Sequence, residues 1–149
     1  MVSGSAGRAH NLVVRMHHPV APLFAYLADP RHRPEWQSSL RRVELLSAKP
    51  TGVGARWRDH TWAGMAPEMR VITHEPQQAW AEEGSWRGLR AFLLMVFVDQ
   101  GDETDLEISV RMRGTGIWRL PAAGAGMLTP AALRGDLARA DRILTQRAT

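Results

Sequence analysis

The chain has 149 residues, of which 44% are hydrophobic and 23% are charged, a composition typical of one globular domain with its own core. No apolar run approaches the roughly 20 residues that span a bilayer, and residues 1–10 lack the apolar segment of a secretory signal. We therefore expect a cytoplasmic protein without a membrane span, in which residues 1–10 are flexible and residues 11–147 form one domain. The sequence contains no cysteine, which excludes disulfides, thiolate catalysis and cysteine-based metal sites.

The positive charge of the chain does not indicate nucleic-acid binding. The net charge of +4 comes from 18 arginines and one lysine against 15 carboxylates. Phosphate-binding proteins gather such cations on one stripe or helix, because affinity follows the number of phosphates neutralised together. Here the arginines are scattered and often alternate with other residues at a two-residue period. Solvated strand faces explain this pattern, so we expect no nucleic-acid partner.

The chain begins with a predicted strand and a short helix. Residues 12–16 are rich in β-branched side chains and predict the strand. Over residues 19–28 the side chains of Leu23, Phe24 and Leu27 form one apolar stripe at helical spacing, which predicts an amphipathic helix.

A second short helix is predicted directly after the first. The residue before Pro30 is pushed out of the helical region, so the first helix ends at Asp29-Pro30. Asp29 is placed to cap a second helix within residues 30–38. We expect Trp36 to fasten this corner to the sheet, and Tyr26, which lies off the apolar stripe, to sit on the helix surface.

The middle of the chain predicts an antiparallel sheet. Turn signals such as Lys49-Pro50-Thr51-Gly52 and Gln100-Gly101-Asp102 separate short apolar segments. The last strand gives the clearest pattern, because apolar and polar residues alternate throughout residues 104–113, which predicts one buried face and one solvated face. The predicted strands are residues 40–46, 53–62, with a bulge or bend at Gly54, 68–74, 79–83, 89–98 and 104–113.

An amphipathic helix is predicted at the C-terminal end. Thr129 and Pro130 have the residue types of a helix cap and a first helical position. Apolar residues then recur three and four positions apart from Leu133 to Leu144, as on a helix packed against an apolar surface. A curved sheet wrapped around this helix buries both apolar faces with few elements.

Several segments, in this order, resemble one family. PVAPLFAYLADPRHRPEW (19–36) is similar to the opening of the START, polyketide-cyclase and birch-pollen-allergen (SRPBCC) superfamily of helix-grip domains, where an apolar helix leads into Asp-Pro and a tryptophan. Similar pieces are GVGARWR (52–58), THEPQQAW (73–80), GDETDLEISV (101–110), with Glu103 in place of a common glycine, and LRGDLARADRIL (133–144).

The resemblance covers residues 11–147 and implies an α+β helix-grip fold. In such a fold, a curved antiparallel sheet of about seven strands and two short helices surround a long C-terminal helix. The family comparison also suggests that this last helix begins earlier, near Trp118 or Leu120. The resemblance is specific for the fold and unspecific for function, because one scaffold hosts carriers, cyclases and regulators.

The fold implies an internal cavity between the sheet and the long helix, mostly apolar with a few polar groups. The alternation of side chains along each strand selects the residues expected to line it. A one-residue error in the register of a strand would replace those residues by the ones on its opposite face. The expected ligand-binding residues are Trp57, Asp59, Thr61, Met69, Val71, Leu93, Met95, Phe97, Leu106, Ile108, Val110, Met112, Leu133 and Leu137.

Candidate catalytic groups are few. Asp59, Arg70 and Glu82 could converge in the cavity, where a buried carboxylate with a raised pKa would act as a general base for cyclisation or dehydration. The alternative places Asp59 on the outer face, paired with Arg56 or Arg58.

The sequence gives no positive signal for a metal or cofactor. His60 and His74 lie on neighbouring predicted strands and could share zinc with Asp59 or Glu68, but no ligand spacing supports this. Phosphate loops and dinucleotide motifs are absent. We expect neither a metal nor a cofactor.

Three functions remain open. The favoured one is binding of a hydrophobic, lipid-like or aromatic small molecule, as carrier or sensor, with the six tryptophans acting as core packing or as cavity wall. The second is a polyketide cyclase or aromatase. The third is a protein-interaction or co-chaperone-like role, with a possible homodimer, because residues 91–98 are apolar on both faces.

Overall fold

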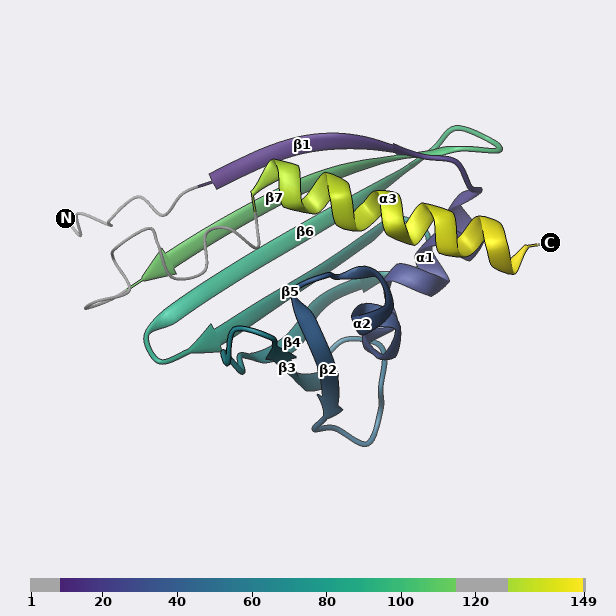
Figure 1. The fold of residues 1–149 in the computed structure, drawn as a ribbon. Coiled ribbons are helices and arrows are strands. Elements are labelled where there is room, and N and C mark those ends of the chain that lie inside the picture. The colour runs from purple at the N-terminus through teal and green to yellow at the C-terminus, as the bar shows by residue number, and fades with distance from the viewer. Residues whose placement is uncertain (1–8, 115–128, 149) are drawn as a thin grey trace.

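A seven-stranded antiparallel sheet curves around one long helix (Figure 1). The structure is a computed structural model and describes residues 9–114 and 129–148. The strand order β1-β7-β6-β5-β4-β3-β2 means that the chain meanders from β2 to β7 and that β1 closes the edge beside β7. The elements are β1 (Ala9–Met16), α1 (Val20–Leu27), the 3-10 turn η1 (Pro30–His32), α2 (Arg33–Trp36), β2 (Leu40–Leu45), β3 (Arg56–Thr61), β4 (Glu68–Glu75), β5 (Ala79–Trp86), β6 (Leu89–Asp99), β7 (Thr104–Gly114) and α3 (Pro130–Arg147).

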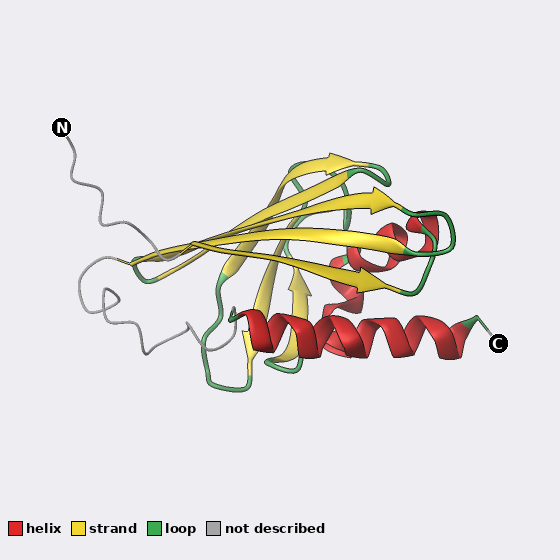
Figure 2. Ribbon diagram, turned by 90° about the horizontal axis from the view of Figure 1, so that it is seen from above, coloured by secondary structure: helices red, strands yellow, loops and turns green. Residues whose placement is uncertain are grey.

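The helices cover one side of the sheet. Helix α3 runs along that side, and the short helices α1 and α2 gather at one end of the sheet (Figure 2). This arrangement confirms the predicted α+β class, with its curved antiparallel sheet, two short helices and long C-terminal helix. None of the helices in the described ranges is long and apolar enough to cross a membrane. The earlier helix start near Trp118 or Leu120 lies outside the described residues, and of residues 1–10 the structure describes only the last two, which belong to β1.

The first strand begins at Ala9 rather than at residue 12, and two strands in the middle of the sheet also differ from their predicted bounds by more than one residue. The strand predicted from residue 53 begins only at Arg56, because Gly52 and Gly54 adopt φ values of +90° and +88° that belong to a turn. The strand predicted to end before Gly84 continues through it to Trp86. A Cβ atom at Gly84 would lie 2.5 Å from Sδ of Met69 on the neighbouring strand, so the end of the flexible Met69 side chain would have to shift.

The Asp29-Pro30 break forms the predicted corner. Asp29 Oδ1 accepts a hydrogen bond from the backbone N–H of Arg31 at 3.0 Å and so caps η1. The Arg31 guanidinium also donates to Oδ2 at 2.7 Å. Trp36, at the end of α2, is buried in the hydrophobic core, as predicted. The corner is therefore held by one polar cap and one large apolar anchor.

The prediction that Tyr26 lies on the helix surface is wrong. Tyr26 is 4% exposed, because other elements cover the side of α1 from which it projects. Its ring stacks on His32 with centroids 4.6 Å apart, and its hydroxyl donates to Glu35 Oε1 at 3.2 Å. The Arg147 guanidinium of α3 lies 5.5 Å from the ring centroid. Helical periodicity alone could not reveal this coverage, which comes from the next turn and helix, through His32 and Glu35, and from Arg147 at the end of α3.

The outer face of β6 remains partly apolar. Leu93 and Met95 point to the buried side, whereas Leu94, between them, is 37% exposed. Strand alternation accounts for this difference. A homodimer through this outer face stays a prediction.

Removal of the Asp29 carboxylate should destabilise the corner. We expect Asp29→Ala to lower the free energy of unfolding by about 1–2 kcal/mol, because the N-terminal amides of η1 lose their cap. Asp29→Asn should retain most of that stability, since its amide oxygen still accepts the hydrogen bond. Urea denaturation measures both changes. Asp102→Ala, in an exposed turn, is the control, and a loss no larger than in that variant would contradict the role of the cap.

Candidate functional site

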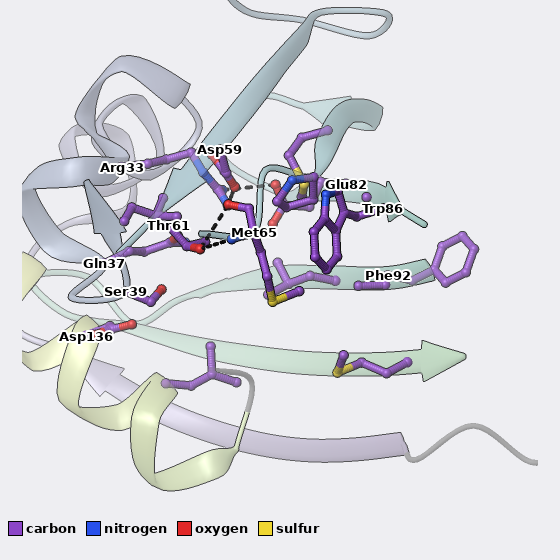
Figure 3. Close-up of a pocket in the computed structure, with 18 of the residues that line it drawn as sticks. Arg33, Gln37, Ser39, Asp59, Thr61, Met65, Glu82, Trp86, Phe92 and Asp136 are labelled. Atoms are coloured by element: carbon purple, nitrogen blue, oxygen red, sulfur yellow. Dashed lines mark hydrogen bonds and ion pairs between the residues drawn. The ribbon is translucent and has the colours of Figure 1, made fainter. Parts of the chain in front are cut away.

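A cavity lies between the sheet, the corner at α2 and helix α3 (Figure 3). The volume open to the centre of a water molecule is about 100 Å³. One water needs roughly 10–15 Å³ of such volume. Several waters or a small ring therefore fit without rearrangement of the protein. Most of the lining is apolar. The lining residues are Arg33, Trp36, Gln37, Ser39, Leu40, Asp59, Thr61, Met65, Pro67, Met69, Trp80, Glu82, Gly84, Ser85, Trp86, Leu89, Ala91, Phe92, Leu93, Met95, Ile108, Met112, Leu133, Asp136 and Leu137.

The structure divides the expected ligand-binding residues into two groups. Those at the cavity are Asp59, Thr61, Met69, Leu93, Met95, Ile108, Met112, Leu133 and Leu137. Those packed in the hydrophobic core instead are Trp57, Val71, Phe97, Leu106 and Val110.

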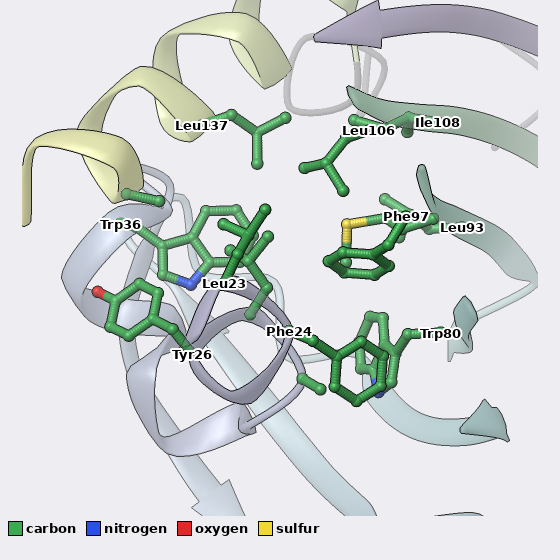
Figure 4. Packing of buried hydrophobic residues seen from close by; sticks show 14 of the residues in the cluster. Leu23, Phe24, Tyr26, Trp36, Trp80, Leu93, Phe97, Leu106, Ile108 and Leu137 are labelled. Carbon is green, nitrogen blue, oxygen red and sulfur yellow. The ribbon is translucent and has the colours of Figure 1, made fainter. Parts of the chain in front are cut away.

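Helix α1 helps to explain why this second group lies in solid core. All five side chains are buried, as their strand parity predicts, but parity does not say how deeply each part of a strand is covered. Phe24 of α1 packs edge-on against Phe97 with ring centroids 5.0 Å apart. Figure 4 shows Leu23 and Phe24 among the surrounding core residues. Side chains from α1 thus fill one part of the concave side and leave space in the other.

Arg33 is the main charged residue of the site that sequence analysis missed. It is buried, and it donates to Asp59 Oδ2 and to Glu82 Oε2, both at 2.9 Å. One signal was available: Arg33 precedes Trp36 by three residues, so helical spacing places both on the same side of the corner. Arg70, proposed as the third member of the set, instead projects to the exposed side and pairs with Glu83.

Asp59 is held on the buried side of β3 by two donors. Besides the bond from Arg33, its Oδ1 accepts a hydrogen bond from Trp57 Nε1 at 2.9 Å. The guanidinium carbon of Arg33 lies 5.3 Å from the Trp57 ring centroid, within cation–π range. The alternative that paired Asp59 with Arg56 or Arg58 on the outer face is therefore wrong, since β3 turns Asp59 inward and Arg33 supplies its partner.

Glu82 is the titratable group with the most unusual environment. Burial raises its pKa to about 7, Arg33 opposes this rise and the charge of Asp59 adds to it. Two carboxylates share one guanidinium, so the three groups carry a net negative charge when all are ionised. Near neutral pH Glu82 exists in both protonation states, which is the condition for proton transfer by a carboxyl group.

Asp136 brings a further carboxylate to the cavity from α3. Its Oδ1 accepts hydrogen bonds from the backbone N–H of Ser38 at 3.1 Å and from the Ser38 hydroxyl at 2.9 Å. These bonds tie α3 to the segment between α2 and β2. Sequence analysis placed residue 136 within an amphipathic helix but gave no reason to select it.

The histidines considered as zinc ligands have other contacts. His60 Nε2 lies 3.0 Å from Glu44 Oε1, and His74 packs edge-on against Phe24 with ring centroids 5.2 Å apart. Within residues 9–114 and 129–148, no group of three or more His, Cys, Asp or Glu residues is arranged to hold a metal ion.

Comparison with known proteins identifies the fold. No family model and no curated protein matches the chain. Solved structures do match it over most of its length, at identities that show the fold alone. A norcoclaurine synthase point mutant from Thalictrum flavum, in complex with a transition-state analogue, is 10% identical, with a TM-score of 0.74 and coverage of 100% of both chains. Ara h 8.0201 is 10% identical, with a TM-score of 0.74 and coverage of 93% of this chain and 98% of that chain.

A third match comes from the dynemicin biosynthetic locus. DynU16 is 19% identical, with a TM-score of 0.66 and coverage of 92% of this chain and 47% of that chain, so the present chain spans about half of its length. These structures share the fold of the present chain, which confirms the helix-grip fold implied by the sequence resemblance.

Loss of Arg33 should be strongly destabilising. We expect Arg33→Gln to lower the free energy of unfolding by about 3–5 kcal/mol, because Asp59 and Glu82 would remain buried without their cation. The double variant Arg33→Gln with Glu82→Gln should recover part of this loss, since one uncompensated carboxylate is removed. Urea denaturation at neutral pH measures the changes. Arg70→Gln, on the exposed side, should lower the free energy of unfolding by at most about 1 kcal/mol. An equally small loss for Arg33→Gln would refute the role of Arg33 as the buried partner of the two carboxylates.

Proposed function

We propose that this protein binds a hydrophobic small molecule in its internal cavity, as a carrier or sensor. The observation that carries this proposal is the cavity itself, because protein interiors are otherwise packed nearly as densely as organic crystals. Its lining combines a majority of apolar residues with a few polar groups, the composition of small-molecule sites in general. The fold neighbour norcoclaurine synthase, crystallised with a transition-state analogue, supports the view that this fold can enclose a small molecule.

Four methionines give the cavity an adaptable wall. Met65, Met69, Met95 and Met112 all line it, and unbranched thioether side chains change rotamer more easily than branched ones. A ligand larger than the resting cavity would be admitted by movement of these side chains. Ser85 is exposed and Trp86 is half-buried, so part of the lining lies near solvent.

A second candidate function is acid–base catalysis of the polyketide-cyclase or dehydrase type. Glu82 favours it, as a buried carboxyl group that lines the cavity with a pKa of about 7. A carboxyl group in this condition can accept a proton from a bound substrate and return it. Arg33 would hold Glu82 in place while its other nitrogen binds Asp59, and Arg70 has no part in this version of the site. The biosynthetic locus of DynU16 is compatible with such chemistry.

Filling the cavity should weaken ligand binding. Leu93→Trp places a large ring at the cavity wall, and we expect it to weaken the binding of the neutral probe N-phenyl-1-naphthylamine by at least about tenfold through lost space. Leu94→Trp, one residue along on the outer face, should leave the affinity unchanged. Fluorescence titration measures affinity, circular dichroism checks folding, and native mass spectrometry of the wild type tests for a retained ligand. Absence of probe binding and of any retained mass would refute the proposal.

The titration of Glu82 should appear in the pH dependence of stability. Its pKa in the folded protein is raised to about 7, so protonation of Glu82 stabilises the folded state relative to the unfolded state. This stabilisation is complete below the pKa that Glu82 has in the unfolded chain, and it is lost as pH rises through about 7. We expect Glu82→Gln to remove this loss, which is on the order of 3 kcal/mol. Thermal unfolding between about pH 5 and pH 8 measures it. Glu83→Gln, the exposed-side neighbour, should keep the wild-type profile, and the same profile in Glu82→Gln would argue against both the raised pKa and the catalytic candidate.

A further inference from the structure

Three buried N–H groups in the cavity lining have no hydrogen-bond partner. They are Nε of Arg33 and Nε1 of Trp36, both on α2, and Nε1 of Trp80 on β5. Their residues are only 4%, 4% and 1% exposed. The one other unpartnered buried side-chain atom among the described residues, Nδ1 of His74, belongs to a residue that does not line the cavity. Unpartnered buried polar atoms are therefore concentrated in the walls of the cavity.

Each of the three groups needs an acceptor. Indole and guanidinium N–H groups donate hydrogen bonds and cannot accept them. A buried donor without a partner is costly, and native structures leave few of them. The carboxylates of the lining do not accept from these three atoms. An occupant of the cavity that carries an acceptor atom can supply the missing partner.

The charges of the lining favour an uncharged acceptor. The described lining holds one cation, Arg33, and three carboxylates, Asp59, Glu82 and Asp136. Their formal charges sum to −1 with Glu82 protonated and to −2 with it ionised. The guanidinium is already paired with two of these carboxylates, so an anionic ligand would meet net repulsion at short range. A neutral oxygen accepts the same hydrogen bonds without this repulsion.

We propose that the ligand carries a neutral acceptor oxygen, such as a ketone carbonyl, on an apolar body. This inference rests on the proposed binding function and narrows its ligand to one chemical class. A carbonyl oxygen has two lone pairs, so it can accept from two N–H groups at once. Arg33 and Trp36 lie three residues apart on α2, a spacing that places two side chains on the same side of a helix. They are therefore the pair best placed to share one oxygen.

The arrangement of the lining gives such a ligand an orientation. Figure 3 shows Arg33 and Gln37 toward one side of the cavity and Trp86 and Phe92 toward the other. The carbonyl would lie on the side of α2, where two of the three unpartnered N–H groups originate. The apolar body would extend toward Trp86, where burial of its surface supplies affinity.

Three naphthalene compounds of similar size test the inference on the full chain. They are 1-acetonaphthone, which carries a carbonyl, 1-ethylnaphthalene, which has an apolar group in its place, and 1-naphthoate, which is an anion. Proton–nitrogen correlation NMR of the isotope-labelled protein at neutral pH follows the side-chain N–H signals of arginine and tryptophan directly.

The ketone should move at least one of the three unpartnered N–H signals downfield, because a new hydrogen bond deshields the proton. The hydrocarbon should cause only the shifts that come from its aromatic ring. Two indoles serve as controls within the same spectrum: Trp57, which already donates to Asp59, and Trp62, which is 70% exposed. Their signals should respond to the ketone no more than to the hydrocarbon.

Affinities give a second readout, measured by displacement of N-phenyl-1-naphthylamine. Where an indole signal moves with the ketone, Trp36→Phe or Trp80→Phe removes that donor and changes the space for both neutral compounds alike. The ratio of ketone affinity to hydrocarbon affinity should therefore fall at least about fivefold, as the loss of one hydrogen bond implies. Trp62→Phe should keep the wild-type ratio. In the wild type, 1-naphthoate should bind more weakly than the ketone.

The outcomes separate this inference from the binding function. Ketone-induced shifts no larger than those of the hydrocarbon, or tighter binding of 1-naphthoate than of the ketone, would refute the neutral acceptor and leave the binding function in place. Failure of all three compounds and of N-phenyl-1-naphthylamine would refute both. If a phenylalanine variant does not fold, the wild-type spectra still decide, because through-bond experiments assign these signals without any substitution.

Discussion

The buried contact between Arg33 and its two carboxylates links the parts of this protein on which the site depends. Arg33 lies on α2, Asp59 on β3 and Glu82 on β5, so one guanidinium joins the corner to two strands of the sheet. A charge buried this deeply must be paired, because an uncompensated ion in a protein interior costs several kcal/mol. The bonds between Asp136 and Ser38 attach α3 to the same corner. The polar side of the cavity is therefore also where the helices are fixed to the sheet and to one another.

The cavity exists because the helices fill the concave side of the sheet unequally. Side chains of α1, such as Phe24 against Phe97, pack one region solidly. Elsewhere the cover comes from α2 and α3, and Leu133 and Leu137 of α3 reach the cavity without closing it. Space for a ligand thus depends on how far each helix covers the sheet as well as on the curvature of the strands.

The environment of Glu82 bears on both candidate functions. Its protonated form can donate a proton to a substrate, and its ionised form can accept one. Burial makes both forms accessible near neutral pH, because desolvation raises the pKa while Arg33 limits the rise.

The sequence by itself determined the order and type of the elements. The alternation of residues 104–113, the proline after Asp29 and the apolar stripe of α3 are local patterns, and each fixes the structure of its own segment. Alternation also predicted that Trp57, Asp59 and Thr61 of β3 face inward, but it left open an outward Asp59 paired with Arg56 or Arg58. The tertiary structure alone decided how deeply each inward residue is covered, so that Val71 and Leu106 belong to solid core while Met69 and Ile108 face the cavity. It also decided that Arg33, and not Arg70, meets Asp59 and Glu82. These outcomes depend on contacts between residues far apart in the chain, such as the 49 positions that separate Arg33 from Glu82, and no local periodicity contains that information.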